Sequence, residues 1–140
     1  MEFEKVVSIA EIDEIIPMIQ KLHKGTIDKY VTLAGFITWV SLNLPLSSFN
    51  VWKAKHEDKT VGYAIAEITQ RYFVRECTVV DAYIEINDEE FVKKMYKFIR
   101  DWAEVNECKI FSCYSHRAEA LSRKYKFDTY GTLLMQKIGD

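Results

Sequence analysis

The spacing of hydrophobic and polar positions changes sharply in the middle of the chain, at residues 86–90. Residues 76–86 (ECTVVDAYIEI) are rich in β-branched and aromatic side chains and alternate between two faces, which predicts a strand. One face of this strand carries Thr78, Val80, Ala82, Ile84 and Ile86. From residue 88 the spacing is that of an amphipathic helix, whose apolar side carries Phe91, Met95, Phe98 and Trp102. A short apolar run at residues 109–113 (KIFSC) predicts a second strand, so the pattern indicates a β-α-β unit.

The ends of the central helix carry residues that commonly begin and end helices. Asn87 or Asp88 can cap its first free amides. Asp88, Glu89 and Glu90 suit the positive end of the helix dipole. Asn106 is the expected stop, because asparagine tolerates the left-handed conformation in which many helices end.

The pattern before this unit predicts one strand and two helices. A strand is expected at residues 3–8, followed by an amphipathic helix that opens at residues 8–11 and runs to residue 25. Pro17 falls inside that helix, so we expect the regular part to begin there, with Pro17 in its first turn. Thr26 or Asp28 then starts the second helix.

The rest of the chain completes an alternation of strands and helices. Strands at residues 49–56 and 60–68 are joined by a polar turn at residues 57–59, and we expect a late helix at residues 117–125 and a closing strand at residues 129–138. The order of elements is β-α-α-β-β-β-α-β-α-β, and a length of 140 residues fits a single domain over residues 1–140. Its fold class is α/β, of the α+β type, with helices flanking a mixed, mainly antiparallel sheet.

One stretch of the chain lacks charge altogether. No charged residue occurs between Tyr30 and Trp52, and residues 31–44 are apolar nearly all round. Asn43 and Pro45 interrupt this run before it reaches the roughly 20 residues that span a bilayer. We therefore expect no membrane insertion, and two alternatives stay open. The helix is buried on several sides, or it lines an apolar acceptor pocket or a dimer contact.

Composition and charge narrow the class of partner. The net charge is −2 with acids and bases interspersed, which argues against nucleic acid as a partner. Cys77, Cys108 and Cys113 form no CxxC pair and lie in apolar surroundings, which is typical of reduced thiols and of a cytoplasmic protein. The early acids Glu2 and Glu4 are unlike a signal peptide. The histidines lack ligand spacing, so no metal site is expected.

The order of elements, together with the closing segment AEALSRKYKFDTYGTLLMQK, resembles the GNAT superfamily of N-acetyltransferases over nearly the whole chain. The resemblance implies a sheet that splays between its fourth and fifth strands, with acyl-CoA in the cleft and its pyrophosphate at the start of the following helix. It places the cofactor-binding positions at Tyr83, Ile84, Ile86, Glu89, Glu90, Phe91 and Ser115. We expect the strands at residues 76–86 and 109–113 to be parallel neighbours that diverge at their carboxyl ends.

The pyrophosphate loop departs from the family pattern [QR]xxGx[GA]. The matching residues 87–92 (NDEEFV) contain neither a glycine nor a basic residue. Three carboxylates at Asp88, Glu89 and Glu90 stand where a dianionic pyrophosphate would approach, so acetyl-CoA or another acyl-CoA is expected to bind weakly or not at all.

The acid–base positions implied by the resemblance are also altered. Ser122 takes the place of the tyrosine that protonates the departing thiolate, and a serine hydroxyl is a much weaker acid than a phenol. Tyr125 is the candidate replacement. Candidate general bases are the strand carboxylates Glu67, Asp81 and Glu85.

Three functions stay open on these residues. The first is a degenerate GNAT-like protein that binds a small molecule or a protein in the cleft between the fourth and fifth strands. The second is an atypical but active acetyl-CoA-dependent N-acyltransferase. The third is a structural homodimer without a ligand.

Overall fold

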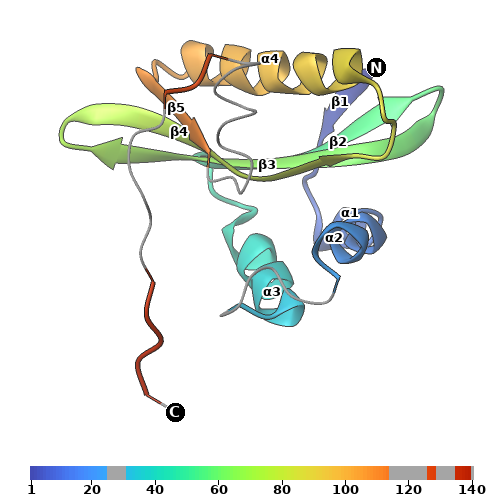
Figure 1. Cartoon of the computed structure of the whole chain (residues 1–140), viewed down its shortest axis with the longest axis horizontal. Helices are drawn as coiled ribbons and strands as arrows, with labels where there is room; N and C mark the ends of the chain where they lie inside the picture. The colour runs from blue at the N-terminus through green and yellow to red at the C-terminus, as the bar shows by residue number, and fades with distance from the viewer. Residues whose placement is uncertain (25–30, 114–125, 129–134, 140) are drawn as a thin grey trace.

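The computed structural model describes residues 1–24, 31–113, 126–128 and 135–139. These residues form a five-stranded sheet in the order β1-β2-β3-β4-β5. The strands are β1 (Glu2–Lys5), β2 (Phe49–His56), β3 (Lys59–Arg71), β4 (Val74–Ile84) and β5 (Ile110–Cys113). All neighbours are antiparallel except β4 and β5, which are parallel. This mixed, mainly antiparallel α/β architecture is the predicted one (Figure 1).

Helices cover both faces of the sheet. Helices α1 (Ile9–Ile12), α2 (Ile16–His23) and α3 (Leu33–Asn43) lie on one face, and α4 (Glu89–Val105) lies along the other (Figure 1). Ser8 begins α1 by accepting a hydrogen bond from the Glu11 amide at 3.4 Å. Pro17 lies in the first turn of α2, as predicted, because a proline amide has no hydrogen to leave unpaired there.

Helix α3 is less buried than the sequence pattern suggests. The predicted starts, Thr26 and Asp28, lie outside the described residues, and α3 itself begins at Leu33. Phe36 and Val40 are buried, whereas Leu42 is 74% exposed. The expectation that this helix is buried on several sides is therefore wrong, since only one side packs on the sheet. No helix among the described residues is long and apolar enough to cross a membrane.

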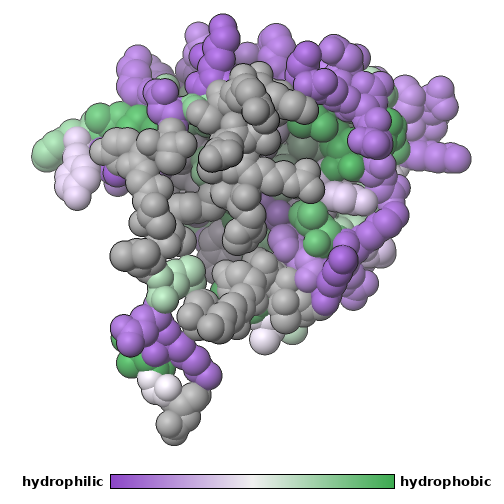
Figure 2. Space-filling model, viewed as in Figure 1, coloured by the Kyte–Doolittle hydropathy of each residue, from purple (hydrophilic) through white to green (hydrophobic). Residues whose placement is uncertain are grey.

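Helix α4 packs on the sheet through the predicted apolar side. Met95 and Ile99 are buried in a cluster with residues of β2, β3 and β4. The Trp52 ring of β2 contacts Phe98 and Trp102 edge-on, with centroid separations of 5.3 and 5.0 Å. Hydrophilic side chains gather along the outward face of α4 (Figure 2). The prediction of an amphipathic helix is therefore confirmed.

A β-bulge in β4 changes which side chains face which helices. Ile65 of β3 pairs with Asp81 and Ala66 pairs with Val79, so Val80 is an extra residue on β4. Val80 packs against the core on the α1–α3 face, while Ala82 and Ile84 pack on the α4 face. The prediction of a single face for residues 78, 80, 82, 84 and 86 is wrong, because the bulge interrupts the alternation.

Strand β5 accompanies only the first part of β4. The pairs run from Glu76 with Ile110 to Val79 with Cys113, and β4 then continues to Ile84 without a β5 partner in the described chain. The predicted parallel neighbours are confirmed, and their divergence beyond residue 113 stays a prediction. The predicted helix at 117–125 lies outside the described residues. Residues 135–138 of the predicted closing strand are not in a strand, and Ile138 is 96% exposed.

Candidate functional site

The carboxylate of Asp81 joins two other polar side chains on the α1–α3 face of the sheet. The Tyr63 hydroxyl donates to its Oδ2 atom at 2.7 Å, and Nε2 of His23 lies 2.8 Å from the same atom. Because an ionised carboxylate can only accept hydrogen bonds, His23 is the donor in this contact. The side chains of Asp81 and His23 keep only 11% and 16% exposure, so the cluster is largely shielded from water.

The Tyr63 phenol is held as a donor. The residue is fully buried, and burial followed by the charge of Asp81 raises the pKa of its hydroxyl far above the usual value. The phenol therefore stays protonated throughout the physiological range and orients the carboxylate of Asp81.

Three elements bring these groups together. The bulge at Val80 turns Asp81 toward the helices, and β3 presents Tyr63 on the same face. Helix α2 ends at His23, and Lys24 caps it in the left-handed conformation with φ 51°. Asp81 is one of the carboxylates predicted from the sequence, whereas His23 and Tyr63 were not predicted. They lie 58 and 18 residues from Asp81, and no local spacing links them.

The other predicted carboxylates do not join this cluster. Glu85 forms an ion pair with Lys21 at 3.2 Å, and the hydrogen bond to Glu85 raises the pKa of Lys21. Glu67 lies four residues along β3 from Tyr63, roughly 13 Å at the rise of an extended strand. The structure therefore separates the three candidate bases and gives Asp81 alone a hydrogen-bonded tyrosine and histidine. Tyr125 lies outside the described residues.

The first amides of α4 are hydrogen-bonded to Asp88 and are not free for a ligand. Oδ1 of Asp88 accepts from the Glu90 amide at 2.9 Å. The Asp88 carbonyl accepts from the amides of Phe91 and Val92 at 3.1 and 3.4 Å. The amides that a pyrophosphate would approach are thus already paired in large part.

Charge at this helix start opposes a phosphate as well. Asp88, Glu89 and Glu90 are exposed, and the Lys93 ammonium lies 3.4 Å from Glu90. Two like charges about 6 Å apart repel by roughly 0.7 kcal/mol even in water. The sum of several such repulsions is comparable to the roughly 0.3–1 kcal/mol that a helix end contributes to binding an anion. The residues present do not fit the pyrophosphate of an acyl-CoA.

The other predicted cofactor positions point in different directions. Tyr83 packs on the α1–α3 core, whereas Ile84 packs with the α4 core. The Phe91 ring lies edge-on to His56 with centroids 5.1 Å apart, so it covers the end of β2. Ile86 follows the end of β4 and is half-buried, and Ser115 lies outside the described residues. The side chains of Tyr83 and Ile84 thus lie on opposite faces of the sheet, and the role of these positions in binding a cofactor stays a prediction.

Neither a reactive thiol at Cys77 nor a metal-binding group of side chains is present among the described residues. Burial raises the pKa of the Cys77 thiol to about 12, so it is almost entirely protonated at neutral pH. Among the residues that the structure describes, no group of three or more His, Cys, Asp or Glu side chains could hold a metal ion.

Comparison with solved structures identifies the architecture. The chain superposes on aminoglycoside N-acetyltransferase AAC(6′)-Iy in complex with CoA with a TM-score of 0.75 and 11% identity, covering 97% of this chain and 93% of that one. It matches aminoglycoside antibiotic 6′-N-acetyltransferase AAC(6′)-IG from Acinetobacter haemolyticus with a TM-score of 0.77, 14% identity and full coverage of both chains. A possible acetyltransferase from Clostridium difficile 630 gives 0.77 and 13%, covering 99% of this chain and 98% of that one.

These similarities establish a GNAT-like fold and no more, because every identity is low. The comparison with protein-family models gives no match, and the comparison with curated protein sequences gives none either. The fold predicted from the order of elements is therefore confirmed.

Proposed function

We propose that this GNAT-fold protein binds an amine-bearing small molecule beside Asp81 and does not use acyl-CoA as a cofactor. The ligand would lie where β4 continues past the end of its pairing with β5, two residues beyond Val79. The protein would thus be a degenerate GNAT-like protein that binds a ligand in the cleft and does not transfer an acyl group.

The arrangement of hydrogen bonds on Asp81 carries this proposal. Tyr63 and His23 both bond to Oδ2, and Oδ1 has no hydrogen-bond partner among the described residues. The Asp81 side chain keeps 11% exposure, so Oδ1 is the carboxylate oxygen that an incoming ligand would meet. A fixed carboxylate with one accessible oxygen in a mostly dry site is suited to an ammonium group.

Two of the structural neighbours support an amine as the ligand. One is named as an aminoglycoside N-acetyltransferase, and another is an aminoglycoside acetyltransferase in complex with sisomicin. Aminoglycosides carry several amino groups. An amine ligand beside Asp81 would agree with the class of substrate that is named for these two neighbours.

Calorimetric titration with acetyl-CoA at low salt tests the cofactor half of the proposal. We expect a dissociation constant above about 100 μM, which corresponds to less than roughly 5.5 kcal/mol of binding free energy. The double variant Glu89→Gln with Glu90→Gln should bind more tightly, because it removes two charges and keeps the Asp88 cap. Glu104→Gln, an exposed change near the far end of α4, is the matched control and should change nothing.

Titration with sisomicin and with spermidine, followed by amide chemical shifts, tests the amine half. Saturable shifts at Asp81 and Tyr83 that weaken by about tenfold in Asp81→Asn are the expected result. Glu67→Gln is the control, since Glu67 lies on the same face but away from the cluster. Low-micromolar binding of acetyl-CoA with acetylation of the amine would overturn the proposal in favour of an active N-acyltransferase. Failure of both ligands to bind would favour the structural homodimer.

A further inference from the structure

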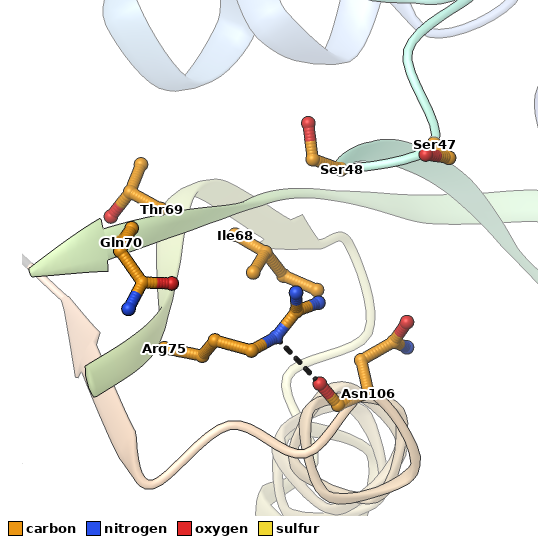
Figure 3. Close-up of a pocket in the computed structure, with 7 residues that line it drawn as sticks. All are labelled: Ser47, Ser48, Ile68, Thr69, Gln70, Arg75 and Asn106. Atoms are coloured by element: carbon orange, nitrogen blue, oxygen red, sulfur yellow. Dashed lines mark hydrogen bonds between the residues drawn. The ribbon is translucent and has the colours of Figure 1, made fainter. Parts of the chain in front are cut away.

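A pocket lies at the other end of the sheet from the start of α4. It has a volume of about 320 Å³ and sits where β3 ends, β4 begins and α4 ends (Figure 3). Its polar lining consists of Ser47, Ser48, Thr69, Gln70, Arg75 and Asn106. The 17 residues of α4 separate it by roughly 25 Å from the position of a CoA pyrophosphate. Asp81 lies six residues along β4 from Arg75, roughly 20 Å at the rise of an extended strand, so the pocket is also distinct from the site beside Asp81.

Among the described residues that line this pocket, Arg75 is the only charged one, and two hydrogen bonds hold it in place. Its Nε donates to the main-chain carbonyl of Asn106 at 2.9 Å, and its own carbonyl accepts from the Lys109 amide at 2.9 Å. Figure 3 shows its guanidinium between Ile68 and Asn106. Its two terminal nitrogens form no hydrogen bond or ion pair with the described residues. Arg71, by contrast, bonds to Glu76 at 3.1 Å.

The neighbouring polar groups are likewise not engaged with the described protein. The hydroxyls of Ser47, Ser48 and Thr69 and the amide of Gln70 form no hydrogen bond with any described residue. Ile68, which is 9% exposed, supplies an apolar wall. A planar guanidinium with two free nitrogens matches a carboxylate in a bidentate pair, and surrounding hydroxyl and amide groups match ligand hydroxyls.

The surroundings favour a single negative charge on the ligand. Asn106 caps the carboxyl end of α4, which is the negative end of its dipole, and Glu104 and Glu107 flank it in the chain. A phosphate dianion would meet more repulsion here than a monocarboxylate. The volume is at the small end of ligand pockets, which suits one small molecule. We propose that this pocket binds a small hydroxylated monocarboxylate, with Arg75 as its anchor.

Gluconate is a suitable probe, with acetate, sorbitol and inorganic phosphate as comparisons. Amide and Arg Nε chemical shifts should show saturable binding of gluconate at Ser48, Gln70 and Arg75. Sorbitol lacks the carboxylate and acetate lacks the hydroxyls, so each should bind more weakly than gluconate. Phosphate binding more tightly than gluconate would overturn the choice of a monocarboxylate.

Variants test whether gluconate binds in this pocket or is only attracted by positive charges nearby. Arg75→Gln should lower the affinity for gluconate by at least about tenfold. Arg75→Lys should lower it measurably, because lysine keeps the charge but lacks the two parallel N–H donors of the guanidinium. Lys109→Gln removes an equal charge nearby and should leave affinity unchanged. Equal losses in Lys109→Gln, or no saturation in the wild type, would overturn the proposal.

Two further variants guard against structural effects. Gln70→Ala changes an exposed side chain and should weaken gluconate without lowering the melting temperature, which keeps the test valid if the Arg75 variants are unstable. Asp81→Asn should bind gluconate normally, so failure of this site and failure of the amine site are distinguishable.

Discussion

Nε2 of His23 lies 2.8 Å from Oδ2 of Asp81, which ties the last residue of α2 to the middle of β4. The same oxygen accepts from the Tyr63 hydroxyl at 2.7 Å, so one carboxylate oxygen joins a helix and two strands. Such a junction stabilises the α1–α3 face of the sheet as well as shaping the proposed amine site. The contribution of this junction to the unfolding free energy can be measured without any ligand.

A double-mutant cycle should detect coupling between His23 and Asp81. We expect His23→Gln and Asp81→Asn each to lower the unfolding free energy, with an interaction energy of about 1 kcal/mol between them. Urea unfolding of both single variants and the double variant measures it. The exposed pair Lys97 and Asp101, 2.6 Å apart on α4, is the control and should couple by about 0.5 kcal/mol or less. Equal coupling in the two cycles would contradict the prediction.

Lys53 is a buried cation surrounded by carboxylates. It is 5% exposed, and its ammonium lies 3.0, 3.6 and 3.9 Å from carboxylate oxygens of Glu14, Glu11 and Glu4. Glu14→Gln should lower the unfolding free energy by about 1–2 kcal/mol. This is less than for a fully buried pair, because Glu14 is half exposed and two carboxylates remain.

The pH dependence of the Lys53 contacts has a definite sign. The hydrogen bond to Glu14 raises the pKa of Lys53. A raised folded pKa means that the stabilisation is fully present below the unfolded value near 10.4 and is lost as the pH rises through the folded one. The stability difference between wild type and Glu14→Gln should therefore be constant from about pH 7 to 10 and shrink above that range. Unfolding of both proteins at several pH values checks this, and a difference that grows above pH 10 would contradict it.

The β3–β4 turn carries two aromatic residues in an unfavourable conformation. Tyr72 and Phe73 have φ values of 48° and 69° and are 89% and 98% exposed. A turn of this kind favours Asn-Gly, so the paired change Tyr72→Asn with Phe73→Gly should raise the unfolding free energy by about 1 kcal/mol. Thermal unfolding measures the gain.

The β2–β3 turn provides a matched control for that change. Glu57 and Asp58 adopt φ values of 52° and 63°, and aspartate already tolerates this conformation. Glu57→Asn with Asp58→Gly should therefore gain less stability than the aromatic pair. A loss of stability on replacing Tyr72 and Phe73 would mean that the aromatic rings make stabilising contacts.

Cys77 should be the least reactive thiol in the folded protein. Its pKa of about 12 and full burial leave very little thiolate at pH 8, while Cys108 and Cys113 are only partly buried. Labelling with a chromogenic disulfide, followed by peptide mass spectrometry, should find Cys77 modified only after unfolding. The variant Cys77→Ser should leave the native labelling unchanged. Modification of Cys77 as fast as Cys108 would show that its strand opens readily.

Local sequence rules predicted where helix α4 begins and ends. Helix α4 begins directly after Asp88, whose side chain caps the Glu90 amide, and it stops at Asn106. The conformation at the stop differs from the expected one. Asn106 has φ −88°, and the following residue, Glu107, is left-handed with φ 62°. The stop position follows from the sequence, whereas the residue that adopts the turn depends on where β5 must begin.

The sequence alone determined the alternation of strands and helices from residue 49 to residue 113, the apolar side of α4 and the three carboxylates at its start. Each is a property of neighbouring residues, read through a period of two or 3.6. The tertiary structure decided the rest. The bulge at Val80 depends on pairing with β3, the burial of α3 depends on what its sides meet, and the cluster at Asp81 joins residues from separate elements. Such contacts are set by packing between distant segments, and no local pattern in the chain encodes them.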